Sequence, residues 1–559
     1  MNVVALTRTY RSLGRIREIA LVLSKHGFNQ ILERAGLGRL LPFSRRIRGR
    51  SGVAGDVPAP VEWRLALEDL GPTFVKLGQM LATRPDLVPP PYVEEFRKLQ
   101  DQVPPFPFQE VLRIVTEELG GPVEEVFHLV HPAPMAAASI AQVHRAQLKD
   151  GTPVVLKVQR PGVDRTISQD LATLFLLAGL VERYIPEART FRPREIVEEF
   201  ARTLNREIDF FLEASNIERF RQNFQGFEGV VIPAVQWDLT SSRLLVMEAI
   251  EGLPADRADA IRERGLDTSA LARTLARAFL KQVFDDGLFH GDLHPGNVLV
   301  TPEGKVAFLD FGAVGYLSEE AQEGLGELFL ALVTRDYAQM AEGFVRLGST
   351  EDTVDLRAFQ RDLKELIEPY FGRPLKDLRV GHLLHESSEI ALRHRVRVPP
   401  DLMLLARSIL TVEGLARTLD PDFVVLDEAV PFARRLLVRR LDPRRQARLA
   451  YRTIRDLREL IRAVPGQVTR ILQKLLEGKL AVDFVHQGYE PILHEMDRSS
   501  NRLAFAMIVS ALIIGSSLIV LAGRGPLLWD FPAFGIFGFL LAGVLGFGLA
   551  IAILRSGKL

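Results

Sequence analysis

The sequence contains no cysteine, and this absence excludes disulfide bonds, thiol catalysis and cysteine-based metal sites. Its 11 histidines are scattered, without an HExxH motif or a histidine pair at ligand spacing beside a carboxylate, so we expect no zinc site. The chain also lacks an excess of charge of either sign, because 70 Lys and Arg balance 70 Asp and Glu. Since no overall field attracts nucleic acid, we expect no nucleic-acid partner, and any electrostatic role must be local.

The N-terminus lacks the long apolar run that a secretory signal peptide requires. Residues 1–28 are rich in arginine, which leaves an organelle transit peptide as one interpretation. The helical spacing of Ile16, Ile19, Val22 and Leu23, together with Glu18, favours the other interpretation, an ordinary amphipathic helix.

Two long uncharged runs of apolar residues occupy the C-terminal end of the chain. Residues 503–522 and 533–554 are each about as long as a helix that crosses a bilayer, and a short turn-rich linker connects them. This pattern predicts a hairpin of two transmembrane helices. The alternative is a buried hairpin inside a soluble core, where two consecutive uncharged spans are rare.

The charges around this hairpin predict its orientation. Arg498 and Arg502 precede it, and Arg555 and Lys558 follow it, whereas the connecting loop has only Arg524. The positive-inside rule therefore places both ends, and with them the large soluble part, on the cytoplasmic side. Small residues in the second run allow close helix contact, which predicts pairing of the two spans or a homodimer through the hairpin; they are Gly535, Gly538, Gly543, Gly546 and Gly548.

A chain of 559 residues is too long for one hydrophobic core, so we expect two or more domains. A β-rich part precedes a larger α-rich part, which is a two-lobed α+β layout that often binds a ligand between the lobes. From residue 431 the chain is rich in arginine, which indicates either a solvated helix face or contact with anionic lipid headgroups. The predicted divisions are basic N-terminal helices and a linker (1–60), a helical extension (61–130), a small β-rich lobe (131–252), an α-rich lobe (253–440), a basic helical linker (441–500) and the transmembrane hairpin (501–555).

The local patterns place strands and helices within these lobes. Residues 142–148 and 154–158 read as strands, and a third strand begins near Ser242. Helices are expected over about 164–184 and 193–224. Residues 296–312 predict a short β-hairpin with a Pro-Glu-Gly turn.

The strongest chemical signal is the motif FHGDLHPGNVLV, residues 289–300. Asp292 is followed five residues later by Asn297, and Asp310 follows after the predicted hairpin, in LDFG. Phosphoryl transfer from a magnesium nucleotide needs oxygen ligands for the metal and a carboxylate that faces the acceptor hydroxyl. Asn297 and Asp310 supply the Mg²⁺ ligands and Asp292 the carboxylate, in the order that protein kinases use. The motif therefore predicts ATP and Mg²⁺ as cofactors.

A loop rich in alanine precedes the strand that carries Lys157. Its residues Ala136, Ala137, Ala138 and Ser139 stand where a kinase has a glycine-rich phosphate loop. Alanine restricts φ, so we expect this nucleotide-binding loop to be stiffer than one of glycines, with the Ser139 hydroxyl as a further contact.

Lys157 is expected to contact the α- and β-phosphates, and it needs an acidic partner that keeps it oriented. The segment LNREIDFFLEASN offers Glu207, Asp209 and Glu213, which we place on one helix, with Asp209 and Glu213 as an i,i+4 pair. Near the expected junction of the lobes, backbone groups from Glu248 to Ile250 would hydrogen-bond the adenine edge.

These motifs together resemble the UbiB family of atypical kinases, also called the AarF or ADCK group. The residues KLGQ, from Lys76 to Gln79, match the family's KxGQ signature. The AAAS loop matches its alanine-rich loop, and Glu207-Ile208-Asp209 with Glu213 matches its ExD element and lysine-pairing glutamate. The resemblance covers roughly residues 10–440, and a C-terminal membrane hairpin also suits bacterial members.

The resemblance implies a protein-kinase-like two-lobed fold with an N-terminal helical KxGQ extension over the active site. It implies that Lys76 and Gln79 point into that site and restrict access, that Glu213 pairs with Lys157, and that Glu207 and Asp209 engage the extension. It further implies an ATPase or a small-molecule or lipid kinase at the bacterial cytoplasmic membrane. Quinone or other prenyl-lipid precursors, enzymes of quinone biosynthesis and membrane lipids are the partners it suggests.

Two other functions remain open from the motifs. Small-molecule phosphotransferases of the aminoglycoside or choline kinase type also carry HGDLHxGN, but they lack the KxGQ extension. A scaffold that binds nucleotide and lipid without turnover would also need the phosphate-binding residues, so their presence does not exclude it.

Overall fold

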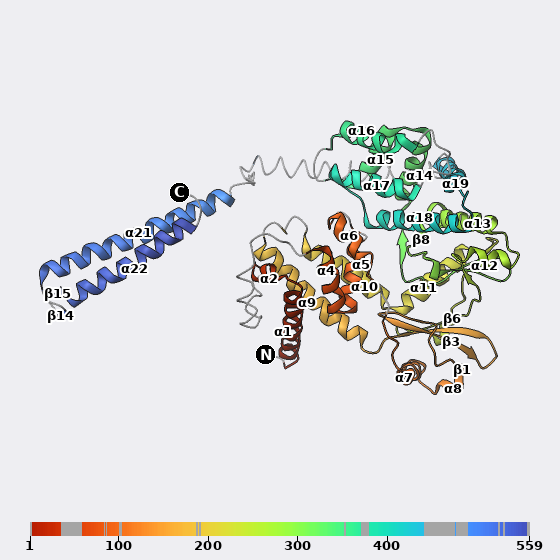
Figure 1. Ribbon diagram of the computed structural model, residues 1–559, viewed down its shortest axis with the longest axis horizontal. Coiled ribbons are helices and arrows are strands. Elements are labelled where there is room, and N and C mark those ends of the chain that lie inside the picture. Colours follow the sequence, from red (N-terminus) through yellow and green to blue (C-terminus); the bar gives the residue numbers. More distant parts are fainter. Residues whose placement is uncertain are drawn as a thin grey trace. The chain divides into compact units, whose positions relative to one another are not determined.

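The computed structural model describes residues 3–34, 59–82, 84, 87–99, 103–185, 188, 192–350, 354–370, 380–440, 476, 490–523, 526–528 and 531–555. The chain divides into two compact units, Met1–Ala447 and Arg448–Leu559. The first unit holds an N-terminal group of helices, a five-stranded sheet and a larger helical part (Figure 1).

The N-terminal group is helical, as predicted, and several of its helices begin at proline. It comprises α1 (Val3–Lys25), α2 (Asn29–Arg34), α4 (Pro60–Leu70), α5 (Pro72–Leu81), α6 (Pro90–Phe96), α7 (Phe108–Leu119) and α8 (Val123–Val126). Proline is tolerated in the first turn because the N–H that it lacks would have no partner there. In α1, Ile16 and Ile19 are buried, which confirms the amphipathic helix.

The sheet has the order β1-β3-β4-β6, with β2 paired to β3. Its strands are β1 (Phe127–Val130), β2 (Ala136–Ala137), β3 (Ala141–Leu148), β4 (Pro153–Gln159) and β6 (Leu244–Glu248). Val154, Leu156 and Val158 of β4 are fully buried in the core that α7 shares with the sheet. Because successive side chains of a strand point to opposite faces, Lys157 projects away from that core.

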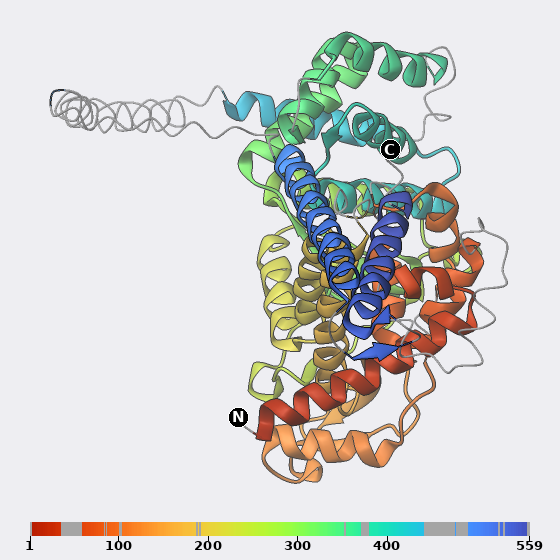
Figure 2. The ribbon, with the colours of Figure 1, turned by 90° about the vertical axis from the view of Figure 1, so that its left-hand side faces the viewer.

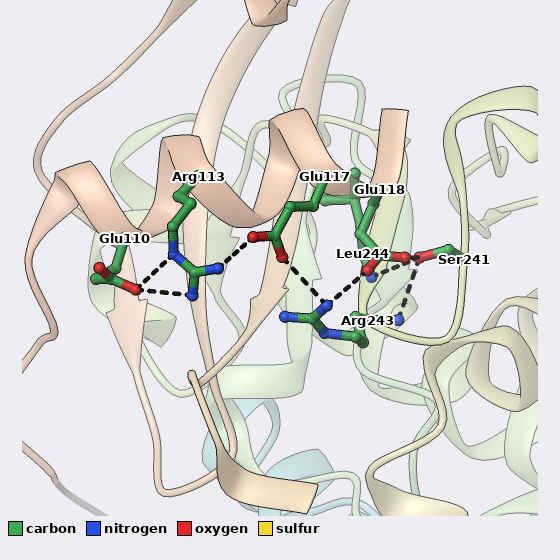
Figure 3. Close-up of polar contacts among 7 residues, drawn as sticks. All are labelled: Glu110, Arg113, Glu117, Glu118, Ser241, Arg243 and Leu244. Atoms are coloured by element: carbon green, nitrogen blue, oxygen red, sulfur yellow. Dashed lines mark hydrogen bonds and ion pairs between the residues drawn. The ribbon is translucent and has the colours of Figure 1, made fainter. Parts of the chain in front are cut away.

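A polar ladder attaches α7 to the loop before β6 (Figure 3). Arg243 Nη1 lies 3.0 Å from Glu118 Oε1, and the Ser241 hydroxyl donates to Glu118 Oε2 at 2.7 Å. Glu117 contacts both Arg243 and Arg113, so the carboxylates of one helical turn serve two guanidinium groups. The ladder ties the helical extension to the small lobe in addition to their shared apolar core.

Three helices, α9 (Val163–Tyr184), α10 (Pro193–Glu207) and α11 (Phe210–Asn223), follow the first strands. The expectation of one helix over 193–224 was wrong, because the chain breaks at Ile208 and Asp209. Asp209 has extended backbone angles, and its carboxylate accepts a hydrogen bond from Phe211 N at 3.0 Å. An aspartate in this position caps a new helix. Glu207 thus ends α10, while Glu213 lies in the first turn of α11.

The larger part is mostly helical. In one short sheet β9 (Val298–Val300) runs antiparallel to β10 (Val306–Phe308), which confirms the predicted hairpin. In another, β8 (Leu288–His290) runs antiparallel to β11 (Val314–Tyr316). The remaining elements are β5 (Val230–Val231), η3 (Trp237–Leu239), β7 (Leu253–Pro254), α12 (Ala258–Glu263), α13 (Thr268–Lys281), the π-helical turn η4 (Gln282–Asp286), η5 (Pro295–Asn297), α14 (Glu319–Thr334), α15 (Tyr337–Leu347), β12 (Ser349–Thr350), α16 (Leu356–Ile367), η6 (Glu368–Tyr370), α17 (Val380–Arg393), β13 (Val396–Arg397), α18 (Pro400–Leu419) and α19 (Val425–Arg440).

The second unit contains α21 (Glu490–Ala522), β14 (Leu527–Leu528), β15 (Phe531–Pro532) and α22 (Ala533–Arg555). Both ribbon views show α21 and α22 side by side (Figures 1 and 2). A Cβ at Gly538 would lie 2.1 Å from Ser516 Oγ, so glycine is needed where the two helices touch. In the described part of the chain, Ser499–Ala522 and Ala533–Ala550 are long and apolar enough to cross a membrane.

Few residues of these spans are buried, which is not the pattern of a core hairpin in a soluble protein. Most of the predicted basic linker, residues 441–475 and 477–489, lies outside the described residues. Helix α21 begins at Glu490, before the predicted start of the hairpin at residue 501. The other predicted domain boundaries stay predictions.

Candidate active site

Three charged side chains from three separate elements meet on the face of the small sheet that is opposite α7. Lys157 Nζ of β4 donates to both carboxylate oxygens of Glu213, at 2.8 and 2.9 Å, and to Asp310 Oδ2 at 3.1 Å. The side chain of Glu213 is 3% exposed and that of Asp310 is 48% exposed. Glu213, of the three candidates, is therefore the residue that pairs with Lys157, and Asp310 presents its carboxylate to solvent.

Burial and neighbouring charges shift the pKa of each of these three side chains. Burial lowers the pKa of Lys157, but the attraction of Asp310 and Glu213 outweighs burial and holds this pKa above its usual value. Burial raises the pKa of Glu213 to about 7, against the opposing attraction of Lys157. Its partial burial also disfavours the charged form of Asp310, yet the Lys157 ammonium keeps the pKa of Asp310 below its usual range. Lys157 and Asp310 thus stay charged at neutral pH.

A buried histidine aligns the loop that carries Asp292. The Nε2 atom of His290 lies 2.9 Å from the Leu309 carbonyl, and its Nδ1 atom accepts from Asp292 N at 3.1 Å. Burial lowers the pKa of His290, so the ring is neutral, with its proton on Nε2. One ring therefore connects the backbone next to Asp310 with the backbone of Asp292.

Further hydrogen bonds fix the same loop. Asn297 Nδ2 donates to the Asp292 carbonyl at 3.0 Å, and the Asn297 carbonyl accepts from Leu309 N at 2.9 Å. Asp310 has a left-handed backbone with φ of 52°, and its Oδ1 accepts from Gly312 N at 3.2 Å. Such a φ is uncommon outside glycine, and the short polar side chain of aspartate tolerates it.

The oxygen atoms of Asp310 and Asn297 fit a magnesium ion. The Asn297 amide uses its nitrogen for the loop, which leaves its oxygen to face a ligand, and Asp310 supplies a half-exposed carboxylate. Among the described residues, no group of three His, Asp or Glu side chains could hold a metal. Mg²⁺ suits such a sparse set, because it usually keeps waters and takes its other ligands from substrate phosphates.

The alanine-rich loop forms a tight hairpin. Ala136 and Ala137 pair with β3, and Ala138 N donates to the Ala141 carbonyl at 2.8 Å. The Ser139 hydroxyl is buried and has no hydrogen-bond partner among the described residues, so it does not face solvent as a nucleotide contact would. Arg160 Nη2 lies 3.1 Å from the carbonyls of both Ala138 and Pro104. This arginine, which the sequence motifs missed, ties the loop to the extension.

The structure narrows the predicted adenine contact. Glu248 N donates to the Ala234 carbonyl, and Ala249 N donates to the Pro153 carbonyl. Within the described chain, no backbone carbonyl accepts from the Ile250 N–H. The Ile250 N–H is therefore the donor of this segment that best suits a base edge, while the Glu248 carboxylate accepts from Ala234 N at 3.2 Å.

The side chains of the two KxGQ residues Lys76 and Gln79 make contacts with different parts of the chain. Lys76 of α5 forms an ion pair with Glu207 of α10, which agrees with the implied contact between Glu207 and the extension. The Gln79 amide instead donates to the Leu99 carbonyl, inside the extension itself, at 3.2 Å. Asp209 was expected to engage the extension, but its carboxylate caps α11 because the helix that was predicted to continue ends there.

A second contact at the site comes from far along the chain. Arg407 Nη2 of α18 lies 3.4 Å from Asp292 Oδ1. No local motif marks Arg407, because 115 residues separate it from Asp292. Only the packing of α18 brings the two side chains together.

Three segments of the chain match known domain families. Residues 98–344 match the ABC1 atypical kinase-like domain, residues 363–424 the UbiB helical domain, and residues 487–555 the ABC1/UbiB kinase-like C-terminal domain. The kinase-like, two-lobed α+β fold with a helical extension and two C-terminal apolar helices therefore agrees with the prediction.

Relatives match over most of their length. A Clostridium pasteurianum protein, described as an uncharacterized protein in the hydrogenase 1 5' region, is 32% identical over 552 residues, 98% of this chain and 100% of that protein. A Marinobacter nauticus protein, described as probable protein kinase UbiB, is 41% identical over 384 residues, 68% of this chain and 70% of that protein. A solved Mycobacterium tuberculosis structure, the complex of Rv3197 with erythromycin, is 27% identical with a TM-score of 0.45 and covers 63% of this chain and 90% of that chain. From its three domain matches and the similarity to the Marinobacter nauticus protein, the chain belongs to the UbiB family of atypical kinases.

Proposed function

We propose that the protein is a membrane-anchored phosphotransferase or ATPase that uses Mg-ATP and supports the biosynthesis of ubiquinone or another prenyl lipid. The observation that carries the proposal is the joint contact of Lys157 with Glu213 and Asp310, beside a loop that presents Asp292 and Asn297. Family membership and the KxGQ extension support this function over a phosphotransferase of the aminoglycoside or choline kinase type.

Each side chain has a definite task in this mechanism. Lys157, held by Glu213, contacts the α- and β-phosphates, and bound Mg²⁺, held by Asp310 and Asn297, would neutralise charge on the phosphate oxygens. Asp292 orients the acceptor hydroxyl or water. The acceptor oxygen bonds to the γ-phosphorus while the bond from this phosphorus to the β–γ bridging oxygen breaks. ADP leaves with that electron pair, and the acceptor proton passes to Asp292.

The second unit supports the location that we propose. Two uncharged helices with basic residues at their outer ends support anchoring in a bacterial cytoplasmic membrane, with the kinase-like unit in the cytoplasm. The arginine-rich segment from residue 431 supports contact with anionic headgroups. Quinone precursors, enzymes of quinone biosynthesis and a second copy bound through the hairpin are the further partners that we propose.

Asp292→Asn should fail to restore quinone levels in a strain that lacks the gene for this protein, because the amide cannot accept the acceptor proton. Quinone content is measured after expression of wild type and variant at equal membrane abundance. Asp238→Asn, which changes an exposed aspartate outside the site, serves as the control. Full rescue by Asp292→Asn would favour the scaffold that binds nucleotide without turnover.

Ala137→Gly should change the affinity for ATP by several-fold, or release an activity such as autophosphorylation. Ala137 pairs with Gln142 across the hairpin, and glycine in a strand loosens it by about 0.5–1 kcal/mol relative to alanine. Nucleotide titration and a radiolabel assay measure the two effects. Ala133→Gly, in the exposed segment before the loop, is the matched control. If Ala137→Gly matched the wild type in nucleotide affinity and turnover, as the control should, Ala137 would have only a packing role.

A further inference from the structure

Helix α18 rests directly on the loop that carries Asp292. A Cβ at Gly291 would lie 2.9 Å from Leu404 Cδ2, so α18 and the loop touch at the residue just before Asp292. Helix α18 also contacts β11, the partner strand of β8. Arg407, one turn after Leu404, therefore shares the face of α18 that meets the loop. The side chain of Arg407 reaches Asp292 because the helix is held there.

The loop that carries Asp292 offers no Lys or Arg side chain to the transferring phosphoryl group. Phosphoryl transfer spreads negative charge over the equatorial oxygens of the transferring group, and cationic side chains stabilise it. The loop of residues 288–300 contains neither Lys nor Arg. In this loop His294 Nδ1 accepts from Gly296 N, so this ring nitrogen serves the backbone. Lys157 is already engaged by two carboxylates.

We propose that Arg407 is a catalytic residue that stabilises the transferring γ-phosphoryl group, a role that rests on the proposed function of this site. Within the described residues its guanidinium contacts one carboxylate, that of Asp292 at 3.4 Å, and its side chain is 52% exposed, so N–H donors remain for a ligand beside Asp292. It lies in residues 363–424, the helical-domain match, and outside the kinase-like match of residues 98–344. The appended helical domain thus supplies an arginine in cis to the kinase-like domain.

The role changes during the reaction. Without nucleotide, Arg407 pairs with the carboxylate that is to receive the acceptor proton. As the γ-phosphorus transfers to the acceptor oxygen, the guanidinium donates to the equatorial oxygens, and Asp292 takes the proton. Arg407 gains and loses no bond to phosphorus, so its effect is electrostatic and greatest in the transition state.

Arg407→Gln in the full-length protein in detergent tests this role. We expect its kcat for Mg-dependent ATP hydrolysis to fall by about 10²- to 10³-fold. The affinity for Mg-ADP should stay within about two-fold of wild type, whereas the affinity for Mg-ADP with aluminium fluoride, which mimics the transferring group, should fall by at least about ten-fold. Arg407→Lys should recover only part of the loss, because an ammonium lacks the planar fork of a guanidinium.

Arg277→Gln is the matched control, because Arg277 is a 56% exposed arginine paired with Glu428 outside the site. Wild-type kcat in Arg407→Gln would overturn the proposal, and so would an equal loss of affinity for Mg-ADP and for the fluoride complex, which indicates a structural role. If the wild type binds Mg-ATP without hydrolysing it, the proposed turnover fails, and retained fluoride affinity in Arg407→Gln then overturns the role of Arg407 separately. A wild type that neither hydrolyses Mg-ATP nor forms the fluoride complex overturns both.

Discussion

Replacing Asp310 with asparagine is expected to abolish Mg-dependent ATP hydrolysis. The substitution keeps the size of the side chain but removes the charge that contacts Lys157 at 3.1 Å and that we propose binds Mg²⁺. A bound metal ion contributes several kcal/mol of charge stabilisation in the transition state, and each 1.4 kcal/mol corresponds to a factor of ten in rate. A loss of about 10³-fold or more follows.

Phosphate release by the purified full-length protein, in detergent or on anionic liposomes, measures this effect at saturating ATP and varied Mg²⁺. Asp238→Asn again controls for the loss of one carboxylate from an exposed position. The fold should survive in Asp310→Asn, because the pair of Lys157 with Glu213 remains. Unchanged turnover in Asp310→Asn would show that the metal site has been assigned to the wrong residue.

Phe220→Ala should produce the largest loss of stability among substitutions near the site. Phe220 of α11 is fully buried, with its ring centroid 4.9 Å from that of Phe311 and 6.4 Å from that of His290. Phe311 follows Asp310, and His290 precedes Asp292 by two residues, so the three rings join three elements of the site. Truncation of a buried phenylalanine costs about 3–5 kcal/mol, through lost burial and the cavity left behind.

A shift of the thermal unfolding midpoint measures this loss, and the effect should extend to catalysis because α11 carries Glu213. Phe211→Ala is the matched control, since Phe211 lies in the first turn of the same helix and is 49% exposed. We expect its midpoint to change far less, because it buries little apolar surface. Similar shifts for both variants would mean that the three-ring cluster does not hold the site together.

The sequence by itself determined those features that depend on neighbours in the chain. The spacing of Asp292, Asn297 and Asp310 predicted the hairpin between them, because a short strand, a turn and a second strand leave few other arrangements. The strand of Lys157 followed from the strand-like run of residues 154–158, and the two apolar C-terminal helices followed from the length and composition of their uncharged runs.

Tertiary structure alone decided which distant groups touch. Periodicity predicted one helix over 193–224, but a single capping aspartate, Asp209, divides it and uses its Oδ1 to cap α11. The pairing of Glu213 with Lys157, which the family resemblance implied, needs α11 packed against β6 of the small sheet, whereas the contact of Arg407 with Asp292 depends on Leu404 seated against Gly291. Such contacts depend on which surfaces pack together, and the pattern of a short sequence segment does not specify this packing.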